Sequence, residues 1–289
     1  MSFLEPTLDV EAEPETVHRP DWEVNRVIAG DCLDHLGAIP ARSVHLVLCD
    51  LPYGTTNNDW DSVIPLPDLW AHYRRVLHPD GMVVLTGQGP FSARLVLSNE
   101  AWFKYTLCWI KSKATNFLNA KKQPLRRHED VCVFAAGVGT YLPQMQPGAA
   151  YDKGVRKAQQ TGSYNDMQPA HVRTSGGRYP TDVVYFKTAE SEGPVWHPTQ
   201  KPVGLGRYLV RTYSRPGAVV LDNACGSGSF LVAALAEGRN YVGIELNAQT
   251  RQFKKAPVDL VAVARERLGS TWATLPERQR SWVTPAARP

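Results

Sequence analysis

The sequence predicts an α/β fold: a doubly wound, mostly parallel sheet with an antiparallel edge strand and one inserted region. Short apolar runs such as Val44–Cys49 and Val219–Asp222 have the length and residue types of buried strands. Segments with helical spacing separate these runs, and such alternation is typical of a parallel sheet covered on both faces. With 289 residues and 43% hydrophobic content, the chain can bury one large core.

The expected elements alternate steadily through the first half of the chain. Residues 25–29 have a short strand pattern, which Gly30-Asp31 breaks before a short helix. Val44–Cys49 is the second expected strand. After it come, in order, a helix over 67–77, a strand over 82–85 and a helix over 90–97. The strand-like runs 105–110 and 131–135 have no long helix between them, so they predict the antiparallel edge.

The alternation fails over residues 137–180, where Gly, Pro, Gln, Ser and Tyr dominate. So long an irregular stretch inside a compact domain is typical of a functional insertion or of disorder. Regular elements resume with a helix over 203–213, a strand over 218–222, a helix after Gly228, a strand over 241–245 and a helix over 258–268. We therefore expect an acidic, disordered tail over 1–22, one domain over 23–272 with its insertion at 137–180, and a loose tail over 273–289.

Composition excludes several classes of protein. No apolar run approaches the length that crosses a bilayer, and the acidic N-terminus is unlike a targeting peptide, so we expect a cytoplasmic protein without membrane contact. The five cysteines are scattered, with no C-x-x-C pair and no His/Cys cluster at zinc spacing. Disulfides and a structural metal are therefore not expected. The net charge of +4 is too small to identify a polyanionic partner by itself.

Residues 101–130 are locally basic, with seven Lys or Arg against two acids, and five aromatic residues are interleaved with them. Such a mixture suits contact with a nucleic-acid backbone and an exposed base, although a solvated face over core aromatics would look the same. The cations that this first interpretation assigns to DNA are Lys111, Lys113, Lys121, Lys122, Arg126 and Arg127.

The irregular insertion carries further cations that could reach base edges in a groove, namely Arg156, Lys157, Arg173 and Arg178. An unstructured surface insertion would have a similar composition.

The second half of the chain holds the pattern of a nucleoside site. Asp222 ends an expected strand, and Gly226-Ser227-Gly228 follows, where glycines let the backbone turn tightly and expose amide hydrogens at a helix start. Glu245 ends the next expected strand, where a carboxylate can accept both ribose hydroxyls. Ligands of open α/β sheets bind beyond the carboxyl ends of the strands. A plain βα turn would account for the glycines alone, but not for the second acid.

The first half holds a motif of a different kind, Asp50-Leu51-Pro52-Tyr53, directly after the strand Val44–Cys49. The carboxylate of Asp50 and the main-chain carbonyl of Leu51 can both accept hydrogen bonds from an amine on an aromatic ring. Tyr53 can stack on that ring, and Pro52 stiffens the loop. The same residues would also fit an ordinary turn. Two sites of these kinds on one sheet indicate group transfer.

Four motifs together resemble the amino-group DNA methyltransferases, which use S-adenosylmethionine. Asp50-Leu51-Pro52-Tyr53 resembles their D-P-P-Y catalytic motif, and the segment 222–229 resembles their D-P-F-x-G-S-G-T cofactor motif. The segment 197–202 is similar to H-P-T-x-K-P, and Gly30-Asp31 to a preceding G-D. The catalytic motif comes first, as in the permuted β group, which implies that 23–272 is the catalytic domain and 137–180 its target-recognition insertion.

The resemblance also implies roles for single residues. Asp50 and Leu51 would hold the amine and Tyr53 would stack on the base. The residues implied for the cofactor pocket are Asp31, Thr199, Lys201, Asp222, Gly226, Ser227, Gly228 and Glu245. The reaction would need no metal and no covalent intermediate, and double-stranded DNA would be the partner. Leu51 in place of Pro keeps the carbonyl, but Asn223-Ala224 in place of Pro-Phe removes an aromatic contact with the adenine of the cofactor.

Asp at the first catalytic position favours adenine N6 as the acceptor, with cytosine N4 as the alternative. A target base would have to be turned out of the duplex to reach the site. More distant alternatives are RNA or a protein glutamine as acceptor, a nicotinamide-dependent oxidoreductase, and a catalytically inactive DNA-binding module. The recognition sequence, a companion restriction enzyme and homodimer formation, which is frequent in the β group, stay open.

Overall fold

The computed structural model of the protein describes residues 15–54, 61–160, 167–246, 251–253 and 256–285. The chain divides into two units. Of the described residues, the larger unit comprises those within 15–142 and 182–285, and the smaller one those within 143–181. The residues that line the predicted cavity belong to the larger unit.

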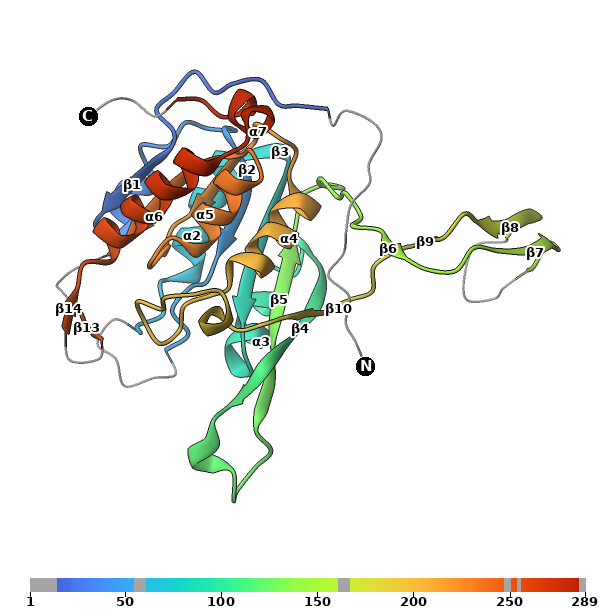
Figure 1. Ribbon diagram of the computed structural model, residues 1–289, viewed down its shortest axis with the longest axis horizontal. Coiled ribbons are helices and arrows are strands. Elements are labelled where there is room, and N and C mark those ends of the chain that lie inside the picture. Colours follow the sequence, from blue (N-terminus) through green and yellow to red (C-terminus); the bar gives the residue numbers. More distant parts are fainter. Residues whose placement is uncertain (1–14, 55–60, 161–166, 247–250, 254–255, 286–289) are drawn as a thin grey trace. The chain divides into compact units, whose positions relative to one another are not determined.

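The larger unit contains most of the regular structure (Figure 1). Its strands are β1 (Arg26–Ala29), β2 (Val44–Cys49), β3 (Leu77–Gly87), β4 (Phe103–Thr115), β5 (Arg126–Phe134), β10 (Val183–Phe186), β11 (Val219–Asp222), β12 (Asn240–Glu245), β13 (Arg251–Phe253) and β14 (Ala256–Val258). Its α-helices are α1 (Cys32–Leu36), α2 (Leu66–Val76), α3 (Pro90–Ser98), α4 (Val203–Tyr213), α5 (Ser229–Ala236), α6 (Leu260–Thr274) and α7 (Glu277–Trp282). Two single turns of 3-10 helix are η1 (Phe117–Asn119) and η2 (Ala189–Ser191).

A sheet of eight strands organises this unit, in the order β1-β12-β11-β2-β3-β5-β4-β10. Neighbouring strands pair in parallel except at β5, which is antiparallel to both β3 and β4. The chain therefore crosses over from β2 to β3 through α2 and from β11 to β12 through α5. The predicted α/β fold with a mostly parallel sheet is confirmed.

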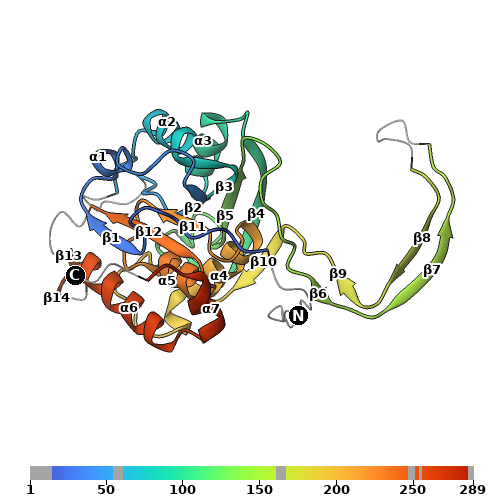
Figure 2. The ribbon, with the colours of Figure 1, turned by 90° about the horizontal axis from the view of Figure 1, so that it is seen from above.

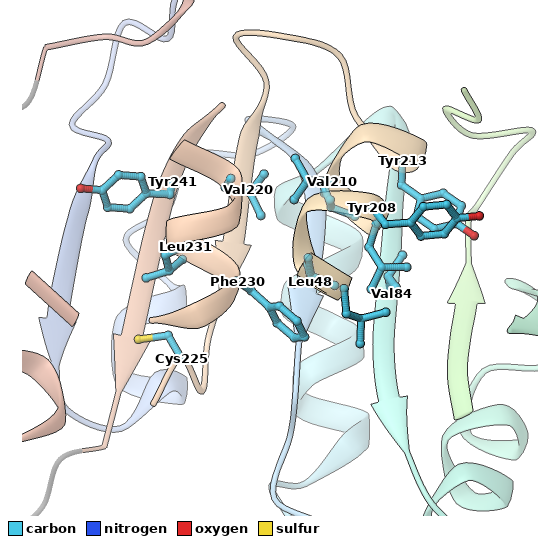
Figure 3. Close-up of a cluster of buried hydrophobic side chains, with 14 of the residues drawn as sticks. Leu48, Val84, Tyr208, Val210, Tyr213, Val220, Cys225, Phe230, Leu231 and Tyr241 are labelled. Carbon is cyan, nitrogen blue, oxygen red and sulfur yellow. The ribbon is translucent and has the colours of Figure 1, made fainter. Parts of the chain in front are cut away.

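Helices cover both faces of the sheet (Figure 2): α1, α2 and α3 lie on one face, and α4, α5 and α6 on the other. Successive side chains of β2 point to opposite faces of the sheet and contribute to the hydrophobic cluster on each face. Leu46 and Leu48 join the cluster under α4 to α6, which Figure 3 shows in close-up, whereas Val47 and Cys49 join the cluster under α1 to α3. Burial on both faces explains why the strand reads as an unbroken apolar run.

The sequence predicts an antiparallel strand at the edge of the sheet, but the antiparallel strand β5 lies inside it. Among the described strands of the sheet, β5 lies between β3 and β4, and the outer position beyond β4 is taken by β10, which is parallel to β4. The sequence analysis missed β10 because it is only four residues long and follows the irregular insertion. The reversal has a consequence for the site, since it brings the first residues of β5 to the edge where β2 and β3 end.

Both predicted tails contain ordered structure where the chain is described. Leu275 and Val283 are buried in the cluster under α4 to α6, and α7 lies between them, so residues 275–283 are not a loose tail. At the other end, Val17 N–H donates to the carbonyl of Pro216 (2.9 Å). Residues 15–22 are therefore attached to the larger unit, whereas 1–14 and 286–289 lie outside the described residues.

The sequence predicts an irregular insertion, but the smaller unit contains regular strands. It forms two antiparallel strand pairs, β6 (Gln146–Pro147) with β9 (Gly177–Arg178) and β7 (Tyr151–Arg156) with β8 (Ala170–Thr174). Polar and charged side chains dominate both pairs, and the alternation that marks a half-buried strand is absent from their sequence. A ribbon with no apolar face gives no periodic signal, which is why the prediction failed.

No helix in the described part of either unit is both long and apolar enough to cross a membrane.

Candidate active site

The two predicted sites share one cavity of about 590 Å³. Asp50, Leu51 and Tyr53 line it from the end of β2, and Asp222 and Glu245 line it from the ends of β11 and β12. These strands are parallel neighbours, so their carboxyl ends meet at one edge of the sheet. A group bound against the one set of residues can therefore reach a group bound against the other.

The glycine turn after β11 is shaped for close approach to a ligand. Gly226 and Gly228 have φ of +53° and +77°, a region that disfavours other residues. The amide of Gly226 donates to Oε2 of Glu245 (2.8 Å), which ties the turn to the end of β12. A Cβ at Gly226 would approach Nε2 of His197 to 3.0 Å.

Asp222 is almost fully buried beside this turn, with 2% of its surface exposed. Burial raises the pKa of its carboxyl to about 7, hydrogen bonds from Cys49 and the Ala224 amide oppose the rise, and the negative charges of Asp50 and Glu245 add to it. Three acids around one cavity favour a ligand with positive charge or hydroxyl donors. The site thus fits the ribose and the cationic methionine portion of S-adenosylmethionine.

The other residues predicted for the cofactor pocket lie around the same cavity. Asp31 caps α1, where its carboxylate accepts from the amide of Leu33 (2.9 Å). Thr199 Oγ1 lies 3.2 Å from Nδ1 of His197, on the segment that precedes α4.

Ser227 links the turn to that segment, because its hydroxyl donates to Oε1 of Gln200 (3.0 Å). Arg267 of α6 donates to the carbonyl of Ser227 (2.6 Å) and lies 4.8 Å from the ring centre of Trp196. Sequence analysis did not single out Arg267, which lies about 40 residues after Ser227 and is separated from it by α5 and three strands. The arginine holds the glycine turn and the segment before α4 together.

Asp50 is enclosed by donors. Its Oδ1 accepts from the hydroxyl of Tyr53 (2.7 Å) and from the hydroxyl of Thr86 on β3, and its Oδ2 accepts from Nζ of Lys201 (2.5 Å). Thr86 is fully buried in an apolar strand and could not be recognised as a site residue from sequence.

Lys201 lies beside Asp50, in a cavity that also includes Asp222 and Glu245, so its expected place in the cofactor pocket stays a prediction. Besides Asp50, its Nζ contacts Oε2 of Glu129 (3.4 Å) and lies 5.6 Å from the ring centre of Tyr53. Burial lowers the pKa of Lys201, but the charges of Asp50 and Glu129 outweigh that effect and raise it to about 12. Lys201 is therefore cationic at every working pH.

The ring of Tyr53 already has an aromatic neighbour, since it stacks on Phe91 with centroids 4.8 Å apart and planes 26° apart. Burial, together with the charges of Asp50 and Glu129, raises the pKa of its hydroxyl well above the usual value. Tyr53 therefore stays protonated and can donate to Asp50. Stacking on Phe91 fixes the plane of the Tyr53 ring, and a base that stacks on Tyr53 would lie parallel to that plane.

The residues predicted to contact DNA fall into three groups. Lys111 is buried, at 3% exposure, and its Nζ donates to Oε1 of Glu129 (3.0 Å), so it is not available to a phosphate. The other predicted cations of the basic stretch are exposed on the hairpin formed by β4, β5 and their connection: Lys113, Lys121, Lys122, Arg126 and Arg127. In the smaller unit, Arg156, Lys157 and Arg173 are exposed, whereas Arg178 lies half-buried with its guanidinium 4.7 Å from the ring centre of Tyr151.

A family model described as DNA methylase matches residues 44–255, which include the catalytic motif, the hairpin, the smaller unit and the glycine turn. The chain belongs to this family of DNA methylases. The permuted order of its motifs is that of the β group.

Two relatives of known name are similar to this DNA methylase over most of its length. DNA adenine methyltransferase YhdJ of Escherichia coli (strain K12) is 28% identical over 239 residues, which cover 78% of this chain and 80% of the relative. Type II methyltransferase M1.MboII of Moraxella bovis is 25% identical over 248 residues, which cover 78% and 94%.

Solved structures share the fold of this DNA methylase. The complex of M1.HpyAVI with SAM superposes with a TM-score of 0.55 at 17% identity, covering 84% of this chain and 98% of that one. The cytosine-N4-specific PvuII DNA methyltransferase gives a TM-score of 0.53 at 15% identity, covering 90% and 96%. At these identities the likeness concerns the architecture alone.

The described residues of this DNA methylase contain no group of three or more His, Cys, Asp or Glu side chains that could hold a metal ion.

Proposed function

We propose that this DNA methylase transfers a methyl group from S-adenosylmethionine to the exocyclic N6 of adenine in a specific DNA sequence. The observation that supports the proposal most is the single cavity, in which Asp50 and Leu51 face the same space as Asp222, Gly226 and Glu245. Methyl transfer needs the acceptor nitrogen and the donor carbon in contact, and only a shared cavity permits that.

The donor would be held by the glycine turn and the acids around it. Glu245 would accept from the ribose hydroxyls, Gly226 and Gly228 would allow the backbone to approach, and Asp31 and Asp222 would face the positively charged portion. When bound, S-adenosylmethionine supplies an electrophilic methyl group on a sulfonium. Ala224 stands where the family motif has Phe and offers no aromatic contact, and Asn223 before it is buried and accepts from the hydroxyl of Tyr73 (2.6 Å).

The acceptor would be held by the catalytic motif. An exocyclic amine is a weak nucleophile because its lone pair is delocalised into the ring. Asp50 and the main-chain carbonyl of Leu51 would accept hydrogen bonds from its two N–H groups, which favours a pyramidal nitrogen with the lone pair directed at the methyl group. Turning the base out of the duplex costs roughly a few kcal/mol, and stacking on Tyr53 would offset part of that cost.

DNA would lie along the hairpin between β4 and β5. Figure 1 shows this hairpin extending beyond the neighbouring strands, and its exposed cations Lys121, Lys122 and Arg127 suit a phosphate backbone. Phe117 and Leu118 at its tip are 75% and 84% exposed, so apolar contact with bases is available there. The exposed cations of the smaller unit would contribute to reading the sequence.

Adenine rather than cytosine is proposed on two grounds. The acceptor position is Asp, which favours N6, and the E. coli relative is named as an adenine methyltransferase.

The test is transfer of labelled methyl groups to plasmid DNA by the wild type and by Asp50→Ala. Asp68→Ala is a matched control, because Asp68 is an exposed acid on α2 outside the cavity. We expect label from the wild type and the control, and loss of at least about a hundredfold with Asp50→Ala, in the range of lost positioning. Mass spectrometry of the digested product identifies the base. Equal labelling by Asp50→Ala would refute the catalytic assignment, and N4-methylcytosine would refute adenine.

A further inference from the structure

Four charged side chains form a continuous chain of contacts behind the catalytic motif. Asp50 contacts Lys201 (2.5 Å), Lys201 contacts Glu129 (3.4 Å), and Glu129 contacts Lys111 (3.0 Å). Their side chains are 21%, 10%, 14% and 4% exposed, in that order. Two acids and two cations balance, which is the condition under which buried charges persist. We call these residues the charge quartet.

Sheet topology explains how the quartet assembles. β2, β3, β5 and β4 are consecutive neighbours in the sheet. Asp50 follows the carboxyl end of β2, and Lys111 lies in the second half of β4. Because β5 runs the other way, Glu129 near its beginning reaches the same edge, and it pairs with Trp109 in the register. Lys201 enters from the segment before α4 and connects the two acids.

The hydrogen-bond capacity of Asp50 shows what the quartet does. An ionised carboxylate has about four lone-pair sites. Tyr53 and Thr86 use both sites of Oδ1, and Lys201 uses one site of Oδ2. Among the described residues, one site on Oδ2 is left for a further donor. A carboxylate fixed by three donors cannot rotate, so this site has a defined direction.

We propose that Lys201 is a positioning residue for the catalytic carboxylate, that Glu129 anchors Lys201, and that Lys111 is the counterion of Glu129. This inference rests on the proposed function, because it concerns how Asp50 receives the amine. In this proposal neither lysine contacts the cofactor or DNA. Oε2 of Glu129 is buried, and Nζ of Lys201 lies 3.4 Å from it, so Glu129 holds Lys201 in place beside Asp50.

The first part of the test concerns Lys201. We expect Lys201→Met to lower the single-turnover methylation rate on saturating DNA by about a hundredfold, the size of effect that misplacing a reacting group by about 1 Å produces. The affinity for S-adenosylmethionine, measured by calorimetry, stays within about twofold of wild type, whereas Glu245→Gln weakens it. Lys201→Arg recovers part of the rate because it can still donate to Asp50.

The second part separates a counterion from a DNA contact at Lys111. A lysine that neutralises a phosphate contributes about one to the slope of log affinity against log salt. We expect Lys111→Met to leave that slope unchanged while the methylation rate falls, and Lys121→Met to lower the slope. The double variant Lys111→Met with Glu129→Gln should methylate faster than Lys111→Met alone, because it removes the uncompensated acid together with its partner.

Several results would overturn the inference. Weaker cofactor binding by Lys201→Met with an unchanged rate at saturation would return Lys201 to the cofactor pocket. A reduced salt slope for Lys111→Met, or a double variant no faster than the single one, would refute the counterion role. Thermal melting identifies variants that fail to fold, and Lys201→Arg and Glu129→Gln then carry the test. Wild-type protein that methylates cytosine N4 would refute the adenine assignment alone, because either amine would meet the same carboxylate.

Discussion

The buried carboxyl of Asp222 predicts an unusual dependence of stability on pH. Its pKa is raised to about 7 by burial, against a usual value of 3.8. The folded protein therefore binds this proton more tightly than the unfolded chain does. Stability from this group is fully present at low pH and is lost as pH rises from about 4 to about 7. This is the reverse of the common case of a carboxylate stabilised by a partner.

The size of the effect follows from the two values. A difference of about three in pKa corresponds to ~4 kcal/mol, at about 1.4 kcal/mol for each tenfold change in proton affinity. Other groups titrate over the same range, so the informative quantity is the difference between wild type and Asp222→Asn. The amide is neutral at every pH and its oxygen can still accept from the Ala224 amide (3.3 Å in the wild type).

Urea denaturation of both proteins without ligand at pH 4, 5, 6, 7 and 8 measures the difference. We expect the free energy of unfolding of Asp222→Asn, relative to wild type, to increase by up to about 4 kcal/mol between pH 4 and pH 8. Most of the change falls below pH 7. A difference that is constant with pH would show that Asp222 is ionised throughout, and the explanation by burial would be wrong.

Three further predictions concern the turn, the hairpin and the C-terminal segment. Gly228→Ala should lower the free energy of unfolding by about 2–5 kcal/mol in urea titrations, because φ is +77° and the new Cβ would lie 2.9 Å from Cβ of Ala264; a loss under about 1 kcal/mol would contradict this. Replacing Lys121 and Lys122 by Ala should weaken DNA binding and reduce its salt slope by about two, with cofactor affinity unchanged; an unchanged slope would place the DNA elsewhere. Leu275→Ala should cost about 2–5 kcal/mol, because this side chain is only 4% exposed, whereas a loose tail would tolerate the change.

The sequence predicts that the two motifs share one cavity, and the structure confirms it, because the positions of both motifs follow from local patterns. Asp50 and Asp222 each come directly after a buried apolar strand, and in a parallel sheet such positions meet at one edge. The apolar runs and the Gly and Pro residues that follow them were enough to place both motifs at strand ends. The helix α4 was predicted with its observed bounds, since both its apolar face and the prolines before it are visible in the sequence.

The partners of single side chains could not be predicted in the same way. Lys201 belongs to a motif segment that lines the cavity together with Thr199 and Gln200, but nothing in that segment shows that its long side chain contacts Asp50 and Glu129. Lys111 looks like one more cation of a basic stretch. The register of β4 against β5 sets Trp109 opposite Glu129, and Lys111, two residues further along β4, reaches the same acid. Both contacts depend on the direction of a side chain, which spacing along the chain does not determine.

The reversal of β5 connects the proposed DNA-binding hairpin with the proposed catalytic centre. Lys111 and Glu129 stand at the base of the hairpin whose outer part carries the exposed cations. The residue that fixes one end of this hairpin is therefore also the counterion of the acid that holds Lys201 against Asp50. Had β5 been parallel to β3 and β4, its beginning would lie at the opposite edge of the sheet and Glu129 could not reach Lys201. The antiparallel strand of the eight-stranded sheet thus places a charge behind the proposed catalytic carboxylate and carries part of the basic surface proposed to bind DNA.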